Sequence, residues 1–370
     1  TPTTFDGAEA VVWVEIHISQ GSGAYPITSS TTMGGGFNAA MSNGEPNLWG
    51  DQLVFVEPES EHSAATFCEG FALSGGRVTN FTSGQGLVLM KEVLYTISGK
   101  RLPVVFNIGS RALTSQSLNV HAGHDDVMSV ADCGWGILFG RNAQEAGDLC
   151  LISRRAAENS QTPFMNVQDG FLTTHTVESV LALDLEFMKE YVGKPEDKLV
   201  NLMDPESPIM SGVVQNQDSY MKGKISQRWY YDQVGDHLQE AFEEFYRKTG
   251  RRYDFVDAYR CEDAEYILVG MGSYMETAQI TIDYLRDEKG IKAGCLNLYC
   301  FRPFPARQLV EALSHCKAFT VIERMDDPLS TTGNHLTREI KAAFCDAQNG
   351  QNGMPLVEEI PRIYHGAAGL

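Results

Sequence analysis

The sequence predicts an α/β fold: a doubly wound, mostly parallel sheet followed by a second, smaller α/β domain. Short apolar segments alternate with glycine-rich turns and amphipathic helical segments, a spacing typical of βαβ units. The chain has 370 residues, of which 43% are hydrophobic and 21% charged. This is the balance of a globular chain, and the length allows more than one domain, each with a core of its own.

The expected elements of the first domain follow from hydrophobic periodicity and from capping and turn residues. Asp6 can cap a first helix that runs to His17. Apolar side chains recur at helical spacing across 60–73, which predicts a helix there. The other expected elements are strands at 24–28, 53–56, 78–82, 103–109 and 163–168, and helices at 84–97, 142–159 and 176–191.

The composition of the chain changes at the start of its second half. Residues 194–208 combine three prolines with charges and indicate a connector. A helix is expected at 233–248, followed by strands at 266–269, 293–299 and 318–322 and by helices at 274–287 and 306–314. We therefore predict a first domain at 1–200, a connector at 201–254 and a second domain at 255–370.

Charge and cysteine content exclude several classes of function. The 29 basic and 48 acidic residues give a net charge of −19, which disfavours nucleic acid and an anionic membrane surface as partners. No apolar run approaches the roughly 20 residues of a membrane span, and residues 1–7 lack signal-peptide features. None of the eight cysteines forms a C-x-x-C pair. We expect a cytoplasmic protein with reduced thiols and no metal or iron–sulfur cluster of its own.

Four polar stretches each lie at the end of a predicted strand or in the loop after it. They are residues 25–28, 57–62, 83–86 and 111–126. In an open parallel sheet, ligands bind outside the carboxyl ends of the strands. We therefore expect these stretches to form the functional site.

Two charged residues in these stretches, Glu61 and Arg111, are candidates for a chemical role. Macrodipole stabilisation at a helix N-terminus accounts for Glu57 and Glu59. Glu61 lies in the first helical turn and is directed toward the apolar face, where a carboxylate can hold or pass a proton. Arg111 directly follows a predicted strand and can clamp a carboxylate bidentately. An ordinary ion pair with one of the acidic residues is the alternative for Arg111.

The loop HAGHDD at 121–126 resembles a metal-binding string. His121, His124, Asp125 and Asp126 could bind zinc and would then make the protein a metal-dependent hydrolase. The H-x-x-H spacing suits a loop poorly, and no third separated ligand is evident. A structural or substrate loop is the preferred interpretation, and the hydrolase stays an alternative.

Several of these segments together resemble the 2-oxoacid:ferredoxin oxidoreductases, most closely the pyruvate enzymes, over essentially the whole chain. The segments that carry the resemblance are YPIT at 25–28, EPESE at 57–61, FTSGQGLVLM at 81–90, LPVVFNIGSRA at 102–112, HAGHDD at 121–126, QDGF at 168–171 and GMGS at 270–273. The resemblance is to the alpha subunit of the family. It implies a pyrimidine-type thiamine-diphosphate-binding domain followed by a transketolase C-terminal-like domain.

The resemblance also implies roles for individual residues. Glu61 matches the glutamate that hydrogen-bonds N1′ of the cofactor's aminopyrimidine. Thr28 matches the threonine that hydrogen-bonds the substrate, and Arg111 matches the arginine that binds the substrate carboxylate. The remaining cofactor-binding residues that it implies are Pro26, Ser83 and Gln85.

The implied reaction is oxidative decarboxylation of a 2-oxoacid, with pyruvate preferred over oxalate or another 2-oxoacid, to acyl-CoA and CO₂, or the reverse. Coenzyme A is the implied co-substrate, and the electrons pass to ferredoxin. No G-D-G with paired asparagines is present for Mg²⁺ and the diphosphate. Thiamine diphosphate would therefore be shared with a partner subunit, and Mg²⁺ and [4Fe–4S] clusters would lie on subunits of beta, gamma or delta type.

One position departs from the family pattern. The family usually has a proline after YPIT, and this chain has Ser29. The loss of the proline ring is expected to leave the end of the strand at Thr28 less rigid. A catalytically silent scaffold is a further alternative, which the joint presence of Thr28, Glu61 and Arg111 disfavours.

Overall fold

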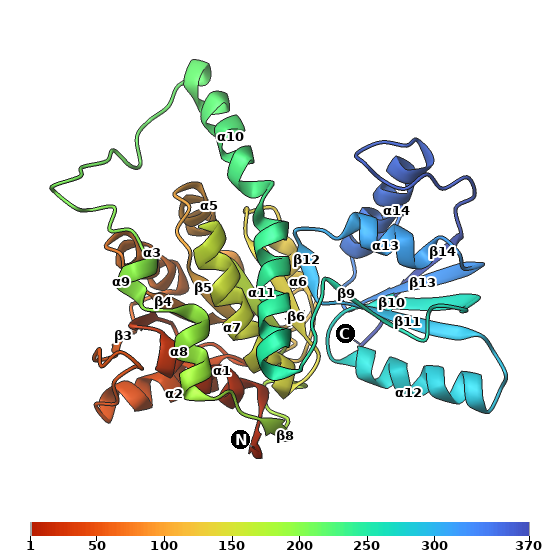
Figure 1. The fold of residues 1–370 in the computed structure, drawn as a ribbon, viewed down its shortest axis with the longest axis horizontal. Helices are drawn as coiled ribbons and strands as arrows, with labels where there is room; N and C mark the ends of the chain where they lie inside the picture. The colour runs from red at the N-terminus through yellow and green to blue at the C-terminus, as the bar shows by residue number, and fades with distance from the viewer. Residues whose placement is uncertain (1, 370) are drawn as a thin grey trace.

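The computed structural model describes residues 2–369 and consists of two α/β units, each built on its own sheet (Figure 1). The strands are β1 (Pro2–Phe5), β2 (Gly21–Gly23), β3 (Val54–Val56), β4 (Val78–Thr82), β5 (Val105–Ser110), β6 (Gly136–Gly140), β7 (Phe164–Asp169), β8 (Glu178–Leu181), β9 (Val256–Tyr259), β10 (Tyr266–Gly270), β11 (Ala293–Leu298), β12 (Cys300–Arg302), β13 (Ala318–Glu323) and β14 (Arg362–Ala367). The helices are α1 (Gly7–Ile18), α2 (Thr31–Ser42), α3 (Glu61–Leu73), α4 (Gly84–Leu89), α5 (Lys91–Gly99), α6 (Asp125–Ser129), α7 (Ala143–Ser160), α8 (Leu185–Val192), α9 (Pro195–Lys198), α10 (Gln217–Tyr231), α11 (Val234–Thr249), α12 (Tyr274–Asp287), α13 (Ala306–Leu313) and α14 (His335–Gln348).

The first unit is the predicted doubly wound sheet. Its strand order is β12-β6-β7-β5-β4-β2-β3, and every neighbouring pair is parallel except β12 with β6. From β2 the chain moves outward to β3 and then returns to the other side of β2 to form β4 and β5. The carboxyl ends of β2 and β4 therefore flank the topological switch point, where open α/β sheets bind ligands.

Helices cover both faces of this sheet, so its central strands are fully buried. Every residue of β4, β5, β6 and β7 is buried, as expected for parallel strands between two helical layers. Helices α1 and α7 pack against each other in one layer, with α8 and α11 outside them. Helices α3, α4 and α5 form the other layer. Among residues 2–369 no helix has the length and apolar character needed to cross a membrane.

The second unit is a five-stranded sheet with the order β14-β13-β10-β11-β9, in which only β9 is antiparallel. Helix α12 packs on one face, and α13 and α14 pack on the other. The side chains on the α13–α14 side belong to the same apolar cluster as those of α3, α4 and α5. The two units are therefore joined by a continuous core.

A single buried carboxylate links the two units by hydrogen bonds. Asp169, at the carboxyl end of β7, lies 2.8 Å from Nε2 of His124. It also accepts hydrogen bonds from the Ser273 backbone N–H at 2.8 Å, the Ser273 hydroxyl at 2.7 Å and Nη1 of Arg324 at 2.8 Å. Burial would raise the pKa of Asp169, but His124, Arg324 and the Ser273 donors outweigh that effect and hold it well below its usual range. The QDGF and GMGS segments thus meet at the junction between the units.

Two features cross the predicted domain limits. Helix α11 lies within the predicted connector 201–254 and packs against α7 of the first unit. Strand β12, from the predicted second domain, pairs with β6 at the edge of the first sheet. The limits 1–200, 201–254 and 255–370 remain a prediction.

The α/β class is confirmed, while several individual elements differ from expectation. The segment 176–191 is strand β8 followed by helix α8, because β8 pairs with β1 at a distance in sequence that periodicity does not reveal. The segment 84–97 divides at Met90 into α4 and α5. The strand expected at 24–28 is wrong in position: the strand is β2 at Gly21–Gly23, and residues 24–28 lie outside any strand. Helix α2 was not expected, because three consecutive glycines, 34–36, weaken its helical signal.

A buried ion pair in the first unit provides a test of this fold. Arg77 and Glu158 are both buried and make two hydrogen bonds, of 2.6 and 2.8 Å. Glu158→Gln leaves the guanidinium uncompensated and should lower the free energy of unfolding by about 3–5 kcal/mol. Chemical denaturation measures this loss. Glu311→Gln, in the exposed Arg307–Glu311 pair, is the control and should cost less than about 1 kcal/mol. Equal losses would contradict the buried placement.

Candidate functional site

The loops at the carboxyl ends of β2, β3, β4 and β5 converge at the switch point of the first sheet. Four of the predicted site residues are brought together there. Glu61 begins α3, Ser83 and Gln85 belong to the turn that starts α4, and Arg111 follows β5. Glycines at the start of α4 allow these groups to approach one another closely.

Glu61 lies against the backbone of α4. Its helix is capped by Ser60, whose hydroxyl accepts the Ser63 backbone N–H at 3.2 Å. A Cβ atom on Gly86 would lie 2.8 Å from Cγ and 3.0 Å from Oε1 of Glu61, so only glycine leaves room for this carboxylate. No residue from 2 to 369 donates a hydrogen bond to it. The half-buried carboxylate of Glu61 is therefore available to a ligand.

Arg111 crosses the start of α4 and is only 5% exposed. Its guanidinium occupies the space that a side chain on Gly84 would need, and Gly84 has a positive φ of 52°. Nη2 of Arg111 donates to Oε1 of Gln85 at 2.8 Å, while Nε is buried with no partner in the described chain. Burial lowers the pKa of Arg111, and the nearby carboxylates of Asp126 and Glu61 oppose that effect. A cation held in this way binds an anion strongly.

Asp126 fixes the two loops that carry these residues. Its Oδ2 atom accepts the backbone N–H groups of Gly84 at 2.8 Å and of Arg111 at 3.1 Å. Its Oδ1 atom accepts the Ser110 hydroxyl at 2.7 Å and the Val127 N–H at 2.8 Å. One buried carboxylate thus ties the end of β4 to the end of β5. Burial raises the pKa of Asp126 to about 6, against the effect of these hydrogen bonds.

Two hydroxyl groups at the end of β4 are buried and unpartnered in the described structure. They belong to Thr82 and Ser83. A Cβ atom added to Gly86 would lie 2.8 Å from Thr82 Oγ1, and a Cβ atom added to Gly109 would lie 3.1 Å from Ser83 Oγ. Buried polar atoms without partners are rare in native proteins, and one common explanation is a missing ligand. Thr82 was not among the predicted site residues, and the FTSGQG segment is its only sequence signal.

Thr28 and Pro26 lie in the loop after β2 with exposed side chains. Pro26 lines a small cavity of about 80 Å³ together with Tyr25 and Glu57. Neither Thr28 nor Pro26 makes a hydrogen bond to Glu61 or Arg111 in the structure. The structure therefore places them at the same edge of the sheet without joining them to the other site residues.

Ser29, the departure from the family pattern, has contacts that hold it in place. Ser29 is buried, and its hydroxyl donates to the carbonyl of Val120 at 3.0 Å. A Cβ atom added to Gly109 would lie 2.7 Å from the carbonyl oxygen of Ser29, so the two backbones approach each other closely. The φ angle of Ser29 is 83°, which the ring of a proline, locked near −65°, cannot adopt. The departure from the family pattern accompanies a different, well-held backbone.

The predicted zinc ligands do not converge. His124 pairs with Asp169 at the junction, and Asp126 accepts the hydrogen bonds described above. The ring of His121 lies 5.0 Å from that of Phe171. Within residues 2–369 no group of three or more histidine, cysteine, aspartate or glutamate side chains could hold a metal ion. His124 and Asp126 have structural contacts in this loop, and the hydrolase alternative has no metal centre among the described residues to support it.

Comparison with protein families covers both units. Residues 14–243 match the model described as pyruvate flavodoxin/ferredoxin oxidoreductase, thiamine diphosphate-binding. Residues 264–362 match core domain II of pyruvate:ferredoxin oxidoreductase. The two matches together account for most of the chain.

Individual relatives agree with these families. The chain is 32% identical to pyruvate-flavodoxin oxidoreductase of a Nostoc species, over 100% of this chain and 31% of that protein. It is 37% identical to the pyruvate synthase subunit PorA of Pyrococcus furiosus, over 81% of this chain and 74% of that protein. The chain thus spans about a third of the longer relatives. A 2-oxoglutarate:ferredoxin oxidoreductase from Magnetococcus marinus, solved with 2-oxoglutarate, coenzyme A and succinyl-CoA, has the same fold. Its TM-score is 0.72 at 16% identity, covering 100% of this chain and 63% of that one.

The Asp126 clamp predicts a specific pH dependence. Asp126 binds its proton near pH 6 in the folded chain but near its ordinary value of 3.8 when unfolded. The folded chain therefore holds the extra proton between these values, and the Asp126 contribution to the free energy of unfolding falls as pH rises from about 4 to about 6. Relative to the Asp126→Asn variant, the free energy of unfolding of the wild type should fall by on the order of 3 kcal/mol between pH 4 and pH 6. Above pH 6 the difference between the two proteins should not change further.

Urea denaturation at a series of pH values measures this difference. Asp218→Asn, an exposed position at the start of α10, is the matched control and should follow the wild-type profile. If the Asp126→Asn and wild-type profiles run parallel from pH 4 to pH 6, the clamp does not titrate as described.

Proposed function

The chain belongs to the pyruvate flavodoxin/ferredoxin oxidoreductase family, and from this we propose that it is the alpha-type part of a thiamine-diphosphate-dependent 2-oxoacid:ferredoxin oxidoreductase. Pyruvate is the proposed substrate, with oxalate or another 2-oxoacid as the alternative. The assembled enzyme would convert the 2-oxoacid and coenzyme A to acyl-CoA and CO₂ with electrons passed to ferredoxin, or run in reverse.

The observation that carries the proposal is the unpartnered carboxylate of Glu61 beside the glycines of α4. An aminopyrimidine needs a carboxyl partner for a ring nitrogen, and Glu61 offers one. Gly86 leaves room for this carboxylate, and Gly84 leaves room for the guanidinium of Arg111 beside it. The hydroxyls of Thr82 and Ser83 lack partners in the described structure and add polar groups at the same place. These residues fit the pyrimidine end of thiamine diphosphate.

In this proposal each residue has one task. Thiamine diphosphate, when bound, supplies a nucleophilic thiazolium carbon and an electron sink for decarboxylation. Glu61 holds a proton at N1′ of the pyrimidine ring through its carboxylate, and Ser83, Gln85 and Pro26 shape the pocket around that ring. Arg111 binds the substrate carboxylate with its buried guanidinium, where the low local dielectric strengthens the contact. Thr28 donates a hydroxyl to the substrate from the loop after β2.

The remaining parts of the enzyme are proposed to lie on other polypeptide. In the described chain no metal-binding cluster is present, and seven of the eight cysteines are buried. This chain spans 31% of the length of the first of the longer relatives, so more than two thirds of that protein lies outside the matched part. Partner subunits of beta, gamma or delta type would supply Mg²⁺, the diphosphate contacts and the [4Fe–4S] clusters. A cytoplasmic complex without nucleic-acid or membrane partners remains part of this proposal.

Glu61→Gln tests the proton-holding role. Glutamine keeps the size of the side chain and loses its proton chemistry, so cofactor binding should survive in part. Exchange of the C2 proton of thiamine diphosphate in the assembled complex should slow by at least about 10²-fold, the low end for a lost acid–base group. Hydrogen–deuterium exchange read by NMR after acid quench measures the rate.

Glu59→Gln is the control for this experiment. The Glu59 carboxylate is exposed and accepts a hydrogen bond from the Ser63 hydroxyl at 2.5 Å, on the outer side of the same turn. Its replacement should leave the exchange rate within about twofold of the wild type, since no proton role is lost. An equal loss from both changes would overturn the assignment of Glu61.

Arg111→Lys and Thr28→Val test substrate binding. Lysine cannot reproduce the planar fork of arginine, so KM for the 2-oxoacid should rise while KM for coenzyme A stays nearly constant. The loss in kcat/KM should be on the order of 2–4 kcal/mol for Arg111→Lys, and about 0.5–1.5 kcal/mol for Thr28→Val. Steady-state kinetics with both substrates measures these values. An Arg111→Lys enzyme whose KM changes only for coenzyme A would contradict the assignment.

A further inference from the structure

The segment from 199 to 231, here called the arm, exposes an unusual amount of apolar surface. It runs from the end of α9 through α10 (Figure 1). Of the 26 large hydrophobic residues exposed among those described, 11 lie in the arm. They are Val200, Met203, Ile209, Met210, Val213, Val214, Tyr220, Met221, Ile225, Trp229 and Tyr230. Concentrations of this kind on a soluble protein mark interaction surfaces.

Within residues 2–369, the contacts that hold helix α10 to the body of the molecule lie near its C-terminal end. It contains no buried residue and projects from the body of the first unit (Figure 1). Gln227 Nε2 donates to the carbonyl of Gly99 at 2.7 Å, and the Tyr231 hydroxyl donates to that of Ser98 at 3.4 Å. The guanidinium of Arg101 lies 3.2 Å from the centre of the Tyr230 ring. The helix is thus anchored at its base, and its outer turns have apolar faces without a partner.

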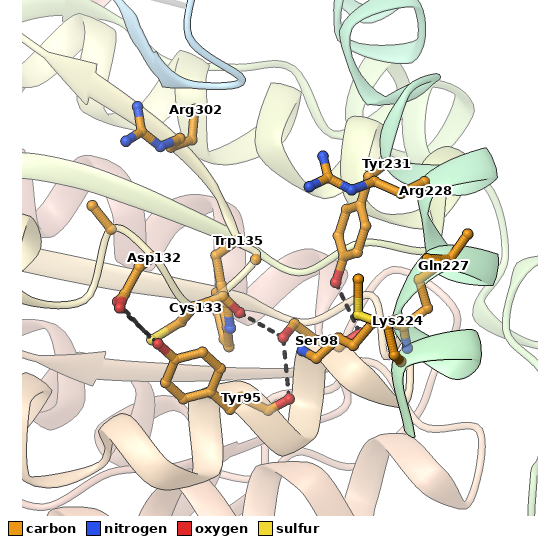
Figure 2. A pocket seen from close by; sticks show the side chains of 14 residues that line it. Tyr95, Ser98, Asp132, Cys133, Trp135, Lys224, Gln227, Arg228, Tyr231 and Arg302 are labelled. Carbon is orange, nitrogen blue, oxygen red and sulfur yellow. Dashed lines mark hydrogen bonds between the residues drawn. The ribbon is translucent and has the colours of Figure 1, made fainter. Parts of the chain in front are cut away.

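A hollow of about 540 Å³ separates α10 from the body (Figure 2). Figure 2 shows Arg228 and Tyr231 on the α10 side, with Tyr95, Asp132 and Cys133 opposite them. Met221 and Ile225 of α10 add apolar groups to the lining. The hollow is therefore continuous with the apolar surface of the arm.

The charge in this hollow is positive and uncompensated. Lys224 and Arg228 line it, and neither has a carboxylate partner among the residues that the structure places. Asp132 is already engaged, by Lys91 at 3.0 Å and by the Tyr95 hydroxyl at 2.7 Å. Arg302, the third cation of the lining, is paired with Glu339. Helix α10 carries three basic residues and one acid in a chain whose net charge is −19.

The hollow is remote from the candidate site. It is lined by residues 131–135, which precede the amino end of β6, and by Ser98, which precedes β5. Glu61 and Arg111 lie at the opposite, carboxyl edge of the same sheet. A contact made here would therefore be separate from the contact that completes the cofactor site.

We propose that the arm is a docking surface for the polypeptide that completes the oxidoreductase, a proposal that rests on the proposed function. The docked segment places an acidic side chain between Lys224 and Arg228 and packs apolar side chains against Met221 and Ile225. Charge complementarity selects such a segment. More than two thirds of the longer relative from Nostoc lies outside the part that this chain matches, and the docked segment can come from polypeptide of that kind.

A second copy of this chain is less suited to dock on the arm than an acidic segment of another polypeptide. Two α10 helices related by a two-fold axis would set Lys224 and Arg228 of one copy against the same cations of the other. Like charges that face each other across an interface oppose association. Self-association through α10 is therefore an outcome that would overturn the proposal.

The test uses the complex assembled by co-expression of this chain with its partner subunits. Ile225→Glu and Arg228→Glu should each weaken assembly at least about tenfold, the effect of losing a contact near the centre of an interface. The matched controls are Ile280→Glu on α12 and Arg247→Glu on α11. Ile280 is 72% exposed against 58% for Ile225, and Arg247 is an exposed arginine without a carboxylate partner in the part of the chain described. Both controls should assemble like the wild type.

Two further measurements complete the test. All four variants should melt at the wild-type temperature as isolated chains, since none of the replaced side chains is buried. Amide hydrogen exchange in 217–231 should slow in the complex relative to the isolated chain. Unchanged exchange in the complex, assembly losses no larger than those of the controls, or self-association through α10 would each overturn the proposal.

These outcomes separate the docking proposal from the proposed function. A complex that turns over 2-oxoacids while α10 exchanges as in the isolated chain would overturn docking and leave the function standing. A complex that assembles through α10 and has no activity on 2-oxoacids would leave docking standing and overturn the function. Failure to assemble with any partner subunit would overturn both.

Discussion

The buried carboxylate of Asp126 is the contact on which the geometry of the candidate site depends. It accepts backbone N–H groups from the ends of two different strands, at Gly84 and at Arg111. Because both groups bind the same oxygen, the two loops cannot separate without leaving a buried charge unpaired, which is costly. Arg111 is thereby held across α4, next to Glu61. Asp169 likewise joins the two units, through its contacts with His124, Ser273 and Arg324. Two buried carboxylates therefore fix the loops at this edge of the sheet.

Both ends of the first sheet have groups without partners in the described structure. At the carboxyl edge, the hydroxyls of Thr82 and Ser83 are buried without partners in residues 2–369, next to the free carboxylate of Glu61, and the proposed function assigns Glu61 and Ser83 to the pyrimidine end of thiamine diphosphate. At the opposite edge, the arm leaves apolar side chains and two cations uncovered. Both features agree with the proposal that other polypeptide covers these two surfaces.

Sequence reasoning succeeded where local signals decide the structure. The strand at 78–82 and the helix at 274–287 were predicted to the residue, because apolar periodicity and flanking turns define them. The meeting of Glu61, Ser83, Gln85 and Arg111 followed from the rule that parallel strands end at a common edge. The Asp126 clamp was not predicted, since Asp126 is 42 residues from Gly84 and only the folded sheet brings them together. Strand β12 and the backbone conformation of Ser29 were not predicted for the same reason.

A structure of the assembled complex with thiamine diphosphate and a 2-oxoacid bound would test the roles proposed for Glu61, Arg111 and Thr28. We expect a carboxylate oxygen of Glu61 within hydrogen-bond distance, about 2.6–3.2 Å, of N1′ of the aminopyrimidine. We also expect the substrate carboxylate on the guanidinium of Arg111, with Thr28 beside the substrate. A pyrimidine ring bound by a different carboxylate, or a 2-oxoacid held beyond hydrogen-bond reach of both Arg111 and Thr28, would show that these roles are wrong.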